Sequence, residues 1–243
     1  MTAHSSHELR RTSVLALVGL LFLVVAIFIV FSVATGDPQE SCSWCKTNAF
    51  DEAVRSALRW EDSRRPAFIS HIVSLAVAPI PALGLVIVPA IRARRGWHGL
   101  RSFFVVINVF LLTTAMADGV KKLFGRERPG FAHGRAALIE AAKAPLERNM
   151  SFFSGDTAWV FTFAAVATSI CWLRGYNIPR WVPVFLFSLG AVEAYLRIAA
   201  DMHWATDVLA GAVVGTLVGS LPLLVHKRVG DQPGSLQQRN PVE

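Results

Sequence analysis

The sequence predicts an all-α membrane protein whose chain crosses the bilayer six times. Of its 243 residues, 53% are hydrophobic and only 17% are charged, a balance that argues against a soluble globular protein. The apolar residues lie in long blocks, several of which approach the roughly 20 residues that a helix needs to span the hydrocarbon core. Composition and block length together predict one membrane domain built from helices.

Six apolar blocks define the predicted spans. The first follows the basic segment HELRRT and exceeds the roughly 7–15 residues of a signal-peptide core, so we interpret it as an uncleaved span. The second contains Pro79, Pro81 and Pro89, which predict kinks that neighbouring helices can accommodate. The predicted spans are residues 14–35, 67–91, 102–120, 157–173, 181–196 and 206–225, in a domain of residues 14–228 between an N-terminal segment (1–13) and a disordered tail (229–243).

An even number of spans places both termini on one side of the membrane. Basic residues gather on that side, at positions 10–11, 92–95, 174, 180 and 227–228, and the positive-inside rule makes it cytoplasmic. The net charge of +7 therefore does not indicate nucleic-acid binding, because no basic run is interleaved with aromatic residues. The short loops and the charge pattern favour a bacterial plasma membrane.

Two cysteines lie close together in the first outer loop. Cys42 and Cys45 have C-x2-C spacing, which without a second pair is a weak metal signal. In an oxidising compartment, a local disulfide between them is favoured over free thiols.

The segment KKLFGRERPG concentrates positive charge where the third span leaves the membrane. Lys121 and Arg128 could belong to a charge run that binds lipid headgroups. They could instead clamp a phosphate, with Arg supplying a planar fork of donors and Lys a point charge.

The segment SFFSGDTAW opens the fourth span. Ser154 or Asp156 could cap this helix. A helix that begins after Ser-Gly also offers free backbone N–H groups to an anion, and Gly155 would let the anion approach closely.

The segment LRIAADMHWATD joins the last two spans. His203 and Asp207 are four residues apart and share a helix face. A carboxylate can orient an imidazole and leave its other nitrogen free for nucleophilic attack. An acid one turn inside the membrane is costly and usually functional, so function is favoured over an interfacial histidine. Arg197 lies at the outer end of the fifth span.

Topology places all three clusters on the outer membrane face. Cationic phosphate ligands, an anion-accepting helix start and an oriented histidine together indicate phosphoryl transfer. A single phosphate site there also accounts for the basic residues on the outer side.

These segments resemble the three signatures of the type 2 phosphatidic acid phosphatase (lipid phosphate phosphatase) superfamily, in its integral membrane branch. K-x6-R-P corresponds to Lys121 through Arg128-Pro129, and P-S-G-H corresponds to 153–156, where only Ser-Gly is kept. S-R-x5-H-x3-D corresponds to 196–207, with Leu196 in place of the serine.

The resemblance implies roles for eight residues and no metal or other cofactor. His203 would attack phosphorus and form a phosphohistidine, with Asp207 steering its imidazole. The family's remaining histidine protonates the leaving group and later activates water, and Asp156 stands in its place. The expected phosphate ligands are Lys121, Arg128, Ser154, Gly155 and Arg197.

Asp156 raises the question of the proton donor. An aspartate with a reference pKa of about 3.9 is ionised at neutral pH, and loss of general acid catalysis slows a reaction by roughly 10²–10⁴-fold. Activity is therefore expected to favour diphosphates, whose leaving group is better, or acidic pH. His133, in the same outer loop, is a possible substitute donor. Glu193, four residues before Arg197, is expected to pair with that arginine.

The leading hypothesis is a metal-independent membrane phosphatase that acts on a lipid phosphate or diphosphate in the bilayer. Phosphatidic acid, phosphatidylglycerol phosphate, an isoprenyl phosphate or diphosphate and a glycolipid phosphate are all candidates. A phosphotransferase that uses the same phosphohistidine is an alternative. A non-catalytic phospholipid-binding or transport protein is another, since Asp156 weakens the catalytic set.

Overall fold

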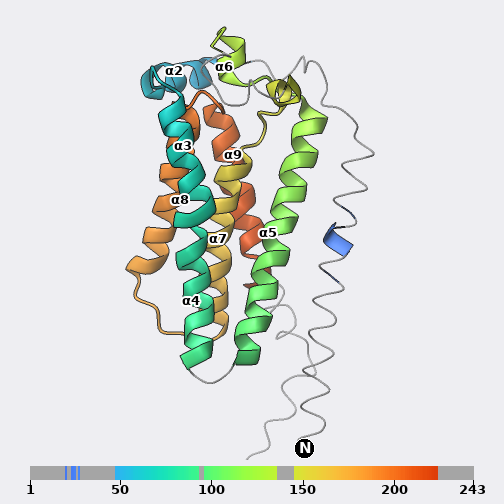
Figure 1. Cartoon of the computed structure of the whole chain (residues 1–243), viewed down its shortest axis with the longest axis vertical. Helices are drawn as coiled ribbons and strands as arrows, with labels where there is room; N and C mark the ends of the chain where they lie inside the picture. Colours follow the sequence, from blue (N-terminus) through green and yellow to red (C-terminus); the bar gives the residue numbers. More distant parts are fainter. Residues whose placement is uncertain are drawn as a thin grey trace, which may run out of the picture.

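Long helices packed side by side form the structure, with two shorter helices across one end (Figure 1). This computed structural model describes residues 47–92, 96–135 and 145–223, and a few residues of the first apolar block. All regular elements in these ranges are helical, which confirms the predicted class. The α-helices are α2 (Ala49–Leu58), α3 (Arg64–Ile72), α4 (Pro79–Arg92), α5 (Gly96–Phe124), α6 (Pro129–Ala132), α7 (Gly155–Leu173), α8 (Trp181–Ala199) and α9 (Ala205–Gly219).

Five of the predicted spans are helices long and apolar enough to cross a membrane. They cover Arg64–Arg92, Gly99–Ala132, Gly155–Leu173, Trp181–Ala199 and Ala205–Leu223. The predicted span 14–35 lies almost entirely outside the described residues, and so do Cys42, Cys45 and the segments 1–13 and 229–243. The six-span count, the domain limits and the disulfide stay predictions.

The second span is one continuous helical rod with an irregular turn in its middle. A π-helical turn, Val73–Val77, joins α3 to α4, and the Ala78 N–H donates to the Val73 carbonyl at 3.0 Å. Pro79 follows directly. Because proline has no N–H and its ring clashes with the preceding turn, α geometry is disturbed here, as the prolines predicted.

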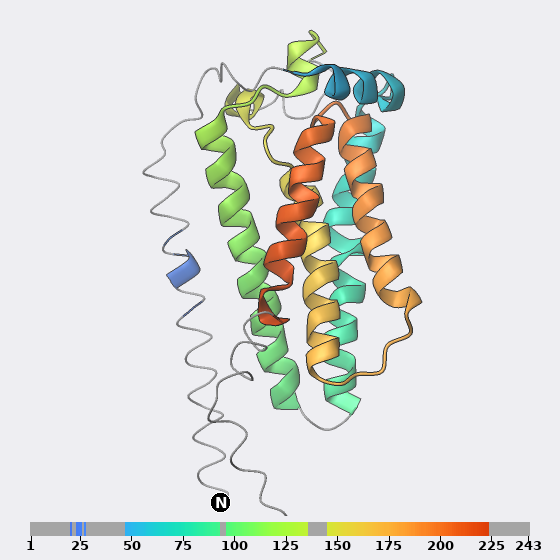
Figure 2. The same ribbon diagram turned by 180° about the vertical axis from the view of Figure 1, so that it is seen from behind.

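Helix α7 lies at the centre of the bundle, against α4, α5, α8 and α9 (Figure 2). Its closest contact is with α9. A Cβ on Gly211 would lie 2.6 Å from the Ser154 carbonyl oxygen, and one on Gly215 would lie 2.2 Å from that of Ala158. The α7 and α9 backbones therefore touch, and only glycine fits at these positions.

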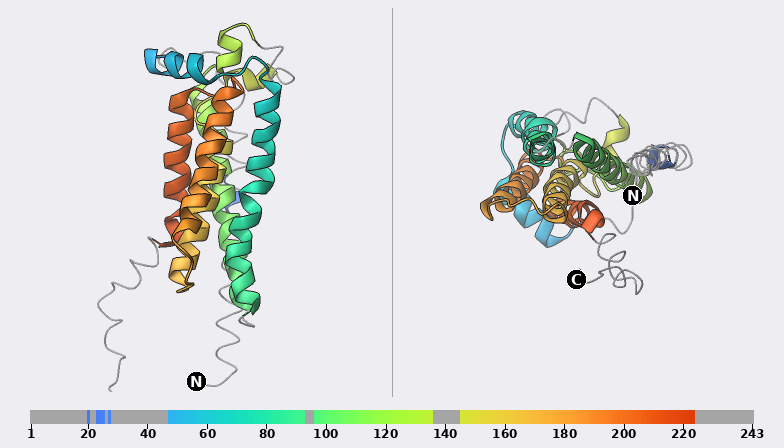
Figure 3. Two further views of the ribbon diagram at one scale, coloured as in Figure 1. Left: turned by 90° about the vertical axis from the view of Figure 1, so that its left-hand side faces the viewer. Right: turned by 90° about the horizontal axis from the view of Figure 1, so that it is seen from below.

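Helix α2 lies across one end of the bundle (Figure 3). It buries two charged side chains, Asp51 and Arg55, while Phe50 is 52% exposed. An amphipathic helix usually buries its apolar face, so the buried charges need polar partners inside the protein. Those partners belong to the candidate site.

Candidate active site

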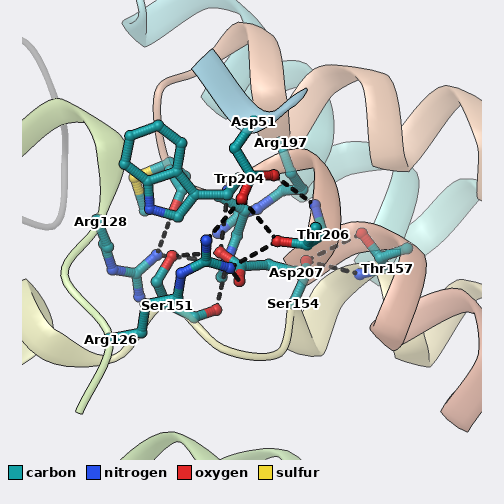
Figure 4. A network of polar contacts seen from close by, with 12 residues as sticks. Asp51, Arg126, Arg128, Ser151, Ser154, Thr157, Arg197, Trp204, Thr206 and Asp207 are labelled. Atoms are coloured by element: carbon teal, nitrogen blue, oxygen red, sulfur yellow. Dashed lines mark hydrogen bonds and ion pairs between the residues drawn. The ribbon is translucent and has the colours of Figure 1, made fainter. Parts of the chain in front are cut away.

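The three predicted clusters meet at the end of the bundle that α2 covers (Figure 4). They come from the end of α5, the segment before α6, the first turn of α7, the end of α8, the α8–α9 connection that carries His203, and the first turn of α9. Topology alone predicted this convergence. The residues brought together are Lys121, Arg128, Ser154, Gly155, Asp156, Arg197, His203 and Asp207.

His203 presents one ring nitrogen to this cluster. Its side chain is fully buried, and Nδ1 lies 2.7 Å from the carbonyl oxygen of Ser151. A carbonyl oxygen only accepts hydrogen bonds, so Nδ1 carries the proton and donates it. Nε2 lies 3.4 Å from Nη1 of Arg128, which can only donate, so Nε2 is left with its lone pair. This is the tautomer that a nucleophilic Nε2 requires.

The surroundings also keep this imidazole neutral. Burial, followed by the positive charges of Arg128, Arg197 and Lys121, holds the pKa of His203 well below its ordinary value of 6.5. At neutral pH, Nε2 is therefore unprotonated.

Asp207 contacts the imidazole less directly than expected. Its Oδ2 lies 3.7 Å from Nδ1 of His203, which is beyond hydrogen-bond range. The same oxygen accepts bonds from Ser151 Oγ at 2.5 Å and the Trp204 N–H at 2.9 Å, while Oδ1 accepts one from Arg126 at 2.5 Å. Asp207 thus holds Ser151, and the Ser151 carbonyl holds His203.

Arg126 links this carboxylate to α2. Its Nη1 donates to Asp207 and to Thr206 Oγ1 at 2.7 Å, and its Nη2 donates to Asp51 at 2.7 Å. Asp51 also accepts bonds from the N–H and the hydroxyl of Thr206, each at 2.9 Å. A buried aspartate on α2 thereby fixes the first turn of α9.

The loop before His203 is fixed from the same side. Asp201 is fully buried and has a positive φ of 58°, a strained conformation for a residue other than glycine. It forms ion pairs with Arg55 of α2 at 2.7 Å and with Arg135 at 2.9 Å. These two arginines hold the loop in place, and Asp201 is not available to a ligand.

Two of the expected phosphate ligands lie beside Asp156. Arg197 pairs with Asp156 at 3.0 Å. A Cβ on Gly155 would be 3.4 Å from Nζ of Lys121, so the ammonium faces the backbone at the start of α7. The acid in the second signature therefore lies among the cations expected to hold the phosphate.

Arg128, the third cation, is also engaged. Its Nε donates to the Glu147 carbonyl at 2.8 Å, its Nη1 donates to the Met202 carbonyl at 3.2 Å, and its Nη2 pairs with the Glu147 carboxylate. The Arg128 side chain is 3% exposed, whereas that of Glu147 is 40% exposed.

Ser154 caps α7. Its Oγ accepts a bond from the Thr157 N–H at 3.4 Å and lies 2.9 Å from Thr157 Oγ1, and its own N–H donates to the Asp207 carbonyl at 3.1 Å. The cap interpretation holds for this residue. The N–H groups that follow Ser154 lie beside Lys121, as an anion site would require.

Glu193 and Arg197 do not form the direct pair expected from their spacing. Ser70, from α3, lies between them, donating to Glu193 at 2.5 Å and accepting from Arg197 at 3.3 Å. A hydroxyl from another helix thus takes the place of the ion pair.

His133 is held by residues outside this cluster. Its Nε2 pairs with Glu52 at 3.2 Å, and its Nδ1 donates to the Pro129 carbonyl at 3.0 Å. Both ring nitrogens are engaged on the rim.

Sequence reasoning missed the residues that support the cluster. Asp51, Ser151 and Glu147 match no signature and lie in segments predicted as loops. Only the density of charge around Arg126 gave a signal. Buried partners far apart in sequence become visible only in the fold.

The comparisons agree with the predicted family. Residues 98–231, more than half of the chain, match the PAP2 superfamily. Phospholipid phosphatase 2 from Bos taurus is 24% identical over 199 residues, covering 70% of this chain and 69% of that protein. Lipid A 1-phosphatase from Porphyromonas gingivalis is 36% identical over 110 residues, covering 45% of this chain and 20% of that protein.

A solved structure is also similar. The crystal structure of Aquifex aeolicus LpxE aligns with a TM-score of 0.45 and 22% identity, over 72% of this chain and 92% of that one.

Helices α2, α3 and α4, which supply Asp51, Arg55 and Ser70, precede the residues of the family match. Because that match covers more than half of the chain and contains all three signatures, the chain belongs to the PAP2 superfamily.

Proposed function

We propose that this protein hydrolyses a lipid phosphate or lipid diphosphate through a phosphohistidine on His203, without a metal. The observation that carries the proposal is the neutral, buried His203, whose unprotonated Nε2 faces Arg128. Lys121, Arg128 and Arg197 would hold the phosphoryl oxygens, with Ser154 fixing the helix start and the Gly155 backbone facing the anion. The relatives named above are phosphatases of lipids, which supports this substrate class.

The reaction would proceed in two steps. His203 Nε2 attacks phosphorus while the bond from phosphorus to the leaving oxygen breaks, and the lipid leaves with that electron pair. Water then attacks phosphorus and gives up a proton to solvent, the P–N bond breaks with its electron pair returning to Nε2, and phosphate and neutral imidazole are released. Three nearby cations would stabilise the charge on the transferring group.

Asp156 bears on which lipid leaves well. Its carboxylate pairs with Arg197 at 3.0 Å, the arrangement of an ionised acid rather than a proton donor. The leaving group of a lipid diphosphate is a phosphate, which is much less basic than an alkoxide. We therefore propose that diphosphates are preferred at neutral pH, and that monophosphates are hydrolysed better at acidic pH.

We also propose that the site faces the extracytoplasmic side of a bacterial plasma membrane, with both termini in the cytoplasm. Arg92, Arg174 and Arg180 lie at the end of the described helices opposite the site. The positive-inside rule makes that end cytoplasmic.

Phosphate release by the detergent-purified protein tests the function. The substrates are phosphatidic acid and an isoprenyl diphosphate, from acidic to neutral pH, and His203→Asn is the inactive control. Asn keeps a donor for the Ser151 carbonyl but has no nucleophilic nitrogen. We expect release by the wild type, faster on the diphosphate at neutral pH, and a loss of about 10³-fold or more in His203→Asn.

Two further variants test the role of Asp156. Asp156→His restores a proton donor and should raise the monophosphate rate by up to roughly 10²–10⁴-fold, with a smaller gain on the diphosphate. Asp156→Asn removes the charge without adding a donor and should not reproduce this gain. Equal wild-type rates on both lipids at neutral pH would refute the diphosphate preference. Release that survives His203→Asn would refute the phosphohistidine.

A further inference from the structure

Arg128 is occupied by a carboxylate of the protein itself. Glu147, on the 3-10 helix Pro145–Asn149, pairs with Nη2 of Arg128, while its own carbonyl accepts the Nε–H at 2.8 Å. A guanidinium that is 3% exposed needs an anionic partner when no substrate is bound, because an unpaired buried charge is strongly unfavourable. Glu147 supplies that partner.

The same contact stands in the way of a phosphate. Arginine binds phosphate most strongly as a fork, through two parallel N–H bonds. On the side that faces His203, Nη1 lies 3.4 Å from Nε2, but Nη2 is turned to Glu147. Glu147 thus occupies the edge that Nε and Nη2 present together, so a phosphoryl group that binds Arg128 through this edge has to displace the Glu147 carboxylate.

Glu147 is placed so that it can be displaced. Its side chain is 40% exposed, so the carboxylate is already partly solvated, and releasing it from Arg128 into water costs little free energy. Asp156 differs, since it lies deeper, at 17% exposure, against Arg197. Among the described residues, no carboxylate lies within ion-pair distance of Lys121, so its ammonium can meet an entering phosphate without first losing a partner.

From this geometry we propose that Glu147 is an internal competitor for Arg128, which the phosphoryl group displaces when it binds. The proposal rests on the proposed function, since it concerns the same phosphate site. Glu147 would set the affinity of the site for anions and weaken the hold on inorganic phosphate, the product. It would thereby help the site to empty after each turnover.

The test is the binding of inorganic phosphate to the full-length protein in detergent, measured by titration calorimetry and by the phosphate-dependent rise in Tm. Glu147→Gln removes the competing charge at nearly constant shape. We expect phosphate to bind about ten-fold more tightly to this variant, because a charge-assisted partner no longer has to be displaced.

Glu127→Gln is the matched control. Glu127 is a half-buried glutamate near the site that pairs with Arg148, at 2.7 and 2.8 Å, and not with Arg128. The Glu127→Gln substitution removes one negative charge, as Glu147→Gln does, and should leave the affinity for phosphate unchanged. Arg128→Ala should weaken phosphate binding in any background and shows that the signal comes from this site.

Weaker binding in Glu147→Gln would mean that Glu147 supports Arg128 rather than competing with phosphate, and unchanged binding would mean that it does neither. Either result overturns the proposal. Because binding is measured without turnover, failure of the proposed hydrolysis would be recognised separately, as an absence of phosphate release from every lipid.

Discussion

Ser151 connects the two residues that the third signature places four apart. Its N–H donates to the Arg126 carbonyl at 2.9 Å, its hydroxyl donates to Asp207, and its carbonyl receives the Nδ1 proton of His203. In the motif-based expectation, the carboxylate orients the imidazole directly. Here the carboxylate orients a serine, and the serine backbone orients the imidazole.

We predict that Ser151→Ala lowers kcat by about 10–100-fold with little change in KM. The substitution removes the bond to Asp207 and loosens the carbonyl that fixes His203, and lost supporting contacts of this kind have effects of about that size. Steady-state kinetics on a lipid phosphate would measure it. Ser56→Ala is the control, because the hydroxyl of this exposed residue donates to the Ala53 carbonyl of its own helix. A rise in KM at constant kcat would assign Ser151 to substrate binding instead.

His203 also predicts how stability depends on pH. Its pKa in the folded protein lies well below that of an unfolded chain, about 6.5, so below pH 6.5 the unfolded state binds more protons. The free energy of unfolding therefore falls as pH drops from about 6.5, by at most about 1.4 kcal/mol per pH unit from this group. Thermal unfolding between pH 7.5 and 5 would show the loss.

The His203→Asn variant isolates this contribution, because asparagine does not titrate yet keeps a donor for Ser151. Its Tm should fall less than that of the wild type across the same pH range. Parallel curves for wild type and His203→Asn would contradict the assignment.

The sequence could predict the residues that carry charge or act as the nucleophile, but it could not predict the residues that hold them in position. Arg128, Arg197 and His203 stand in spaced signatures that sequence alone displays. Glu147 and Asp51 act through partners 19 and 75 residues away, and Ser151 acts on His203 through its backbone, which no residue type reveals.

Helix α2 lies across the end of the bundle that carries the site, and its buried Asp51 and Arg55 form ion pairs with residues in the loops of that site. We predict that Asp51→Asn destabilises the protein by about 1.5–3 kcal/mol, because Arg126 keeps Asp207 but loses the charged acceptor that it shares with Thr206. Activity should fall with it, since Thr206 and Asp207 lose a fixed position. Chemical denaturation would measure the first effect and lipid hydrolysis the second.

Glu52→Gln is the control for Asp51→Asn. It changes the neighbouring acid on the same helix, whose side chain is 39% exposed and pairs with His133 on the rim. A change within about 0.5 kcal/mol is expected there. If Asp51→Asn changed the free energy of unfolding as little as Glu52→Gln, the contacts of Asp51 would not stabilise the fold and the prediction would be wrong.

The spans could be predicted because their signal is local. Runs of apolar residues place the ends of α7 and α8 within three residues of those observed, whereas the predicted ends of α5 and α9 differ from the observed ones by up to six residues. Helix α2 was predicted only as part of an outer loop, since it is short and the side chains that it buries most deeply, Asp51 and Arg55, are charged, which is not the pattern on which such predictions depend. The π-helical turn before Pro79 was indicated only as a kink.

For the molecule as a whole, the proposed orientation gives a direct labelling test. Cysteines at Glu61, near α2, and Asn177, in the α7–α8 connection, would sit at exposed positions on opposite ends of the bundle. In a background without Cys42, Cys45 and Cys171, a membrane-impermeant maleimide should modify Glu61→Cys in intact cells. Asn177→Cys should react only after the membrane is opened, and the reverse pattern would invert the topology.

The backbone contact between α7 and α9 limits which sequences this fold can use. The helix start expected to face phosphate and the helix that follows His203 are separated by no side chain at Gly211 and Gly215, so even one added methyl group must push the two halves of the site apart. A saturation scan of α9 should therefore find these glycines as intolerant as His203, although neither takes part in chemistry. Leu209, 56% exposed on the other side of the same helix, should accept most apolar residues. Selection for catalysis would then conserve the glycines that pack α9 against α7 as well as the residues that take part in the reaction.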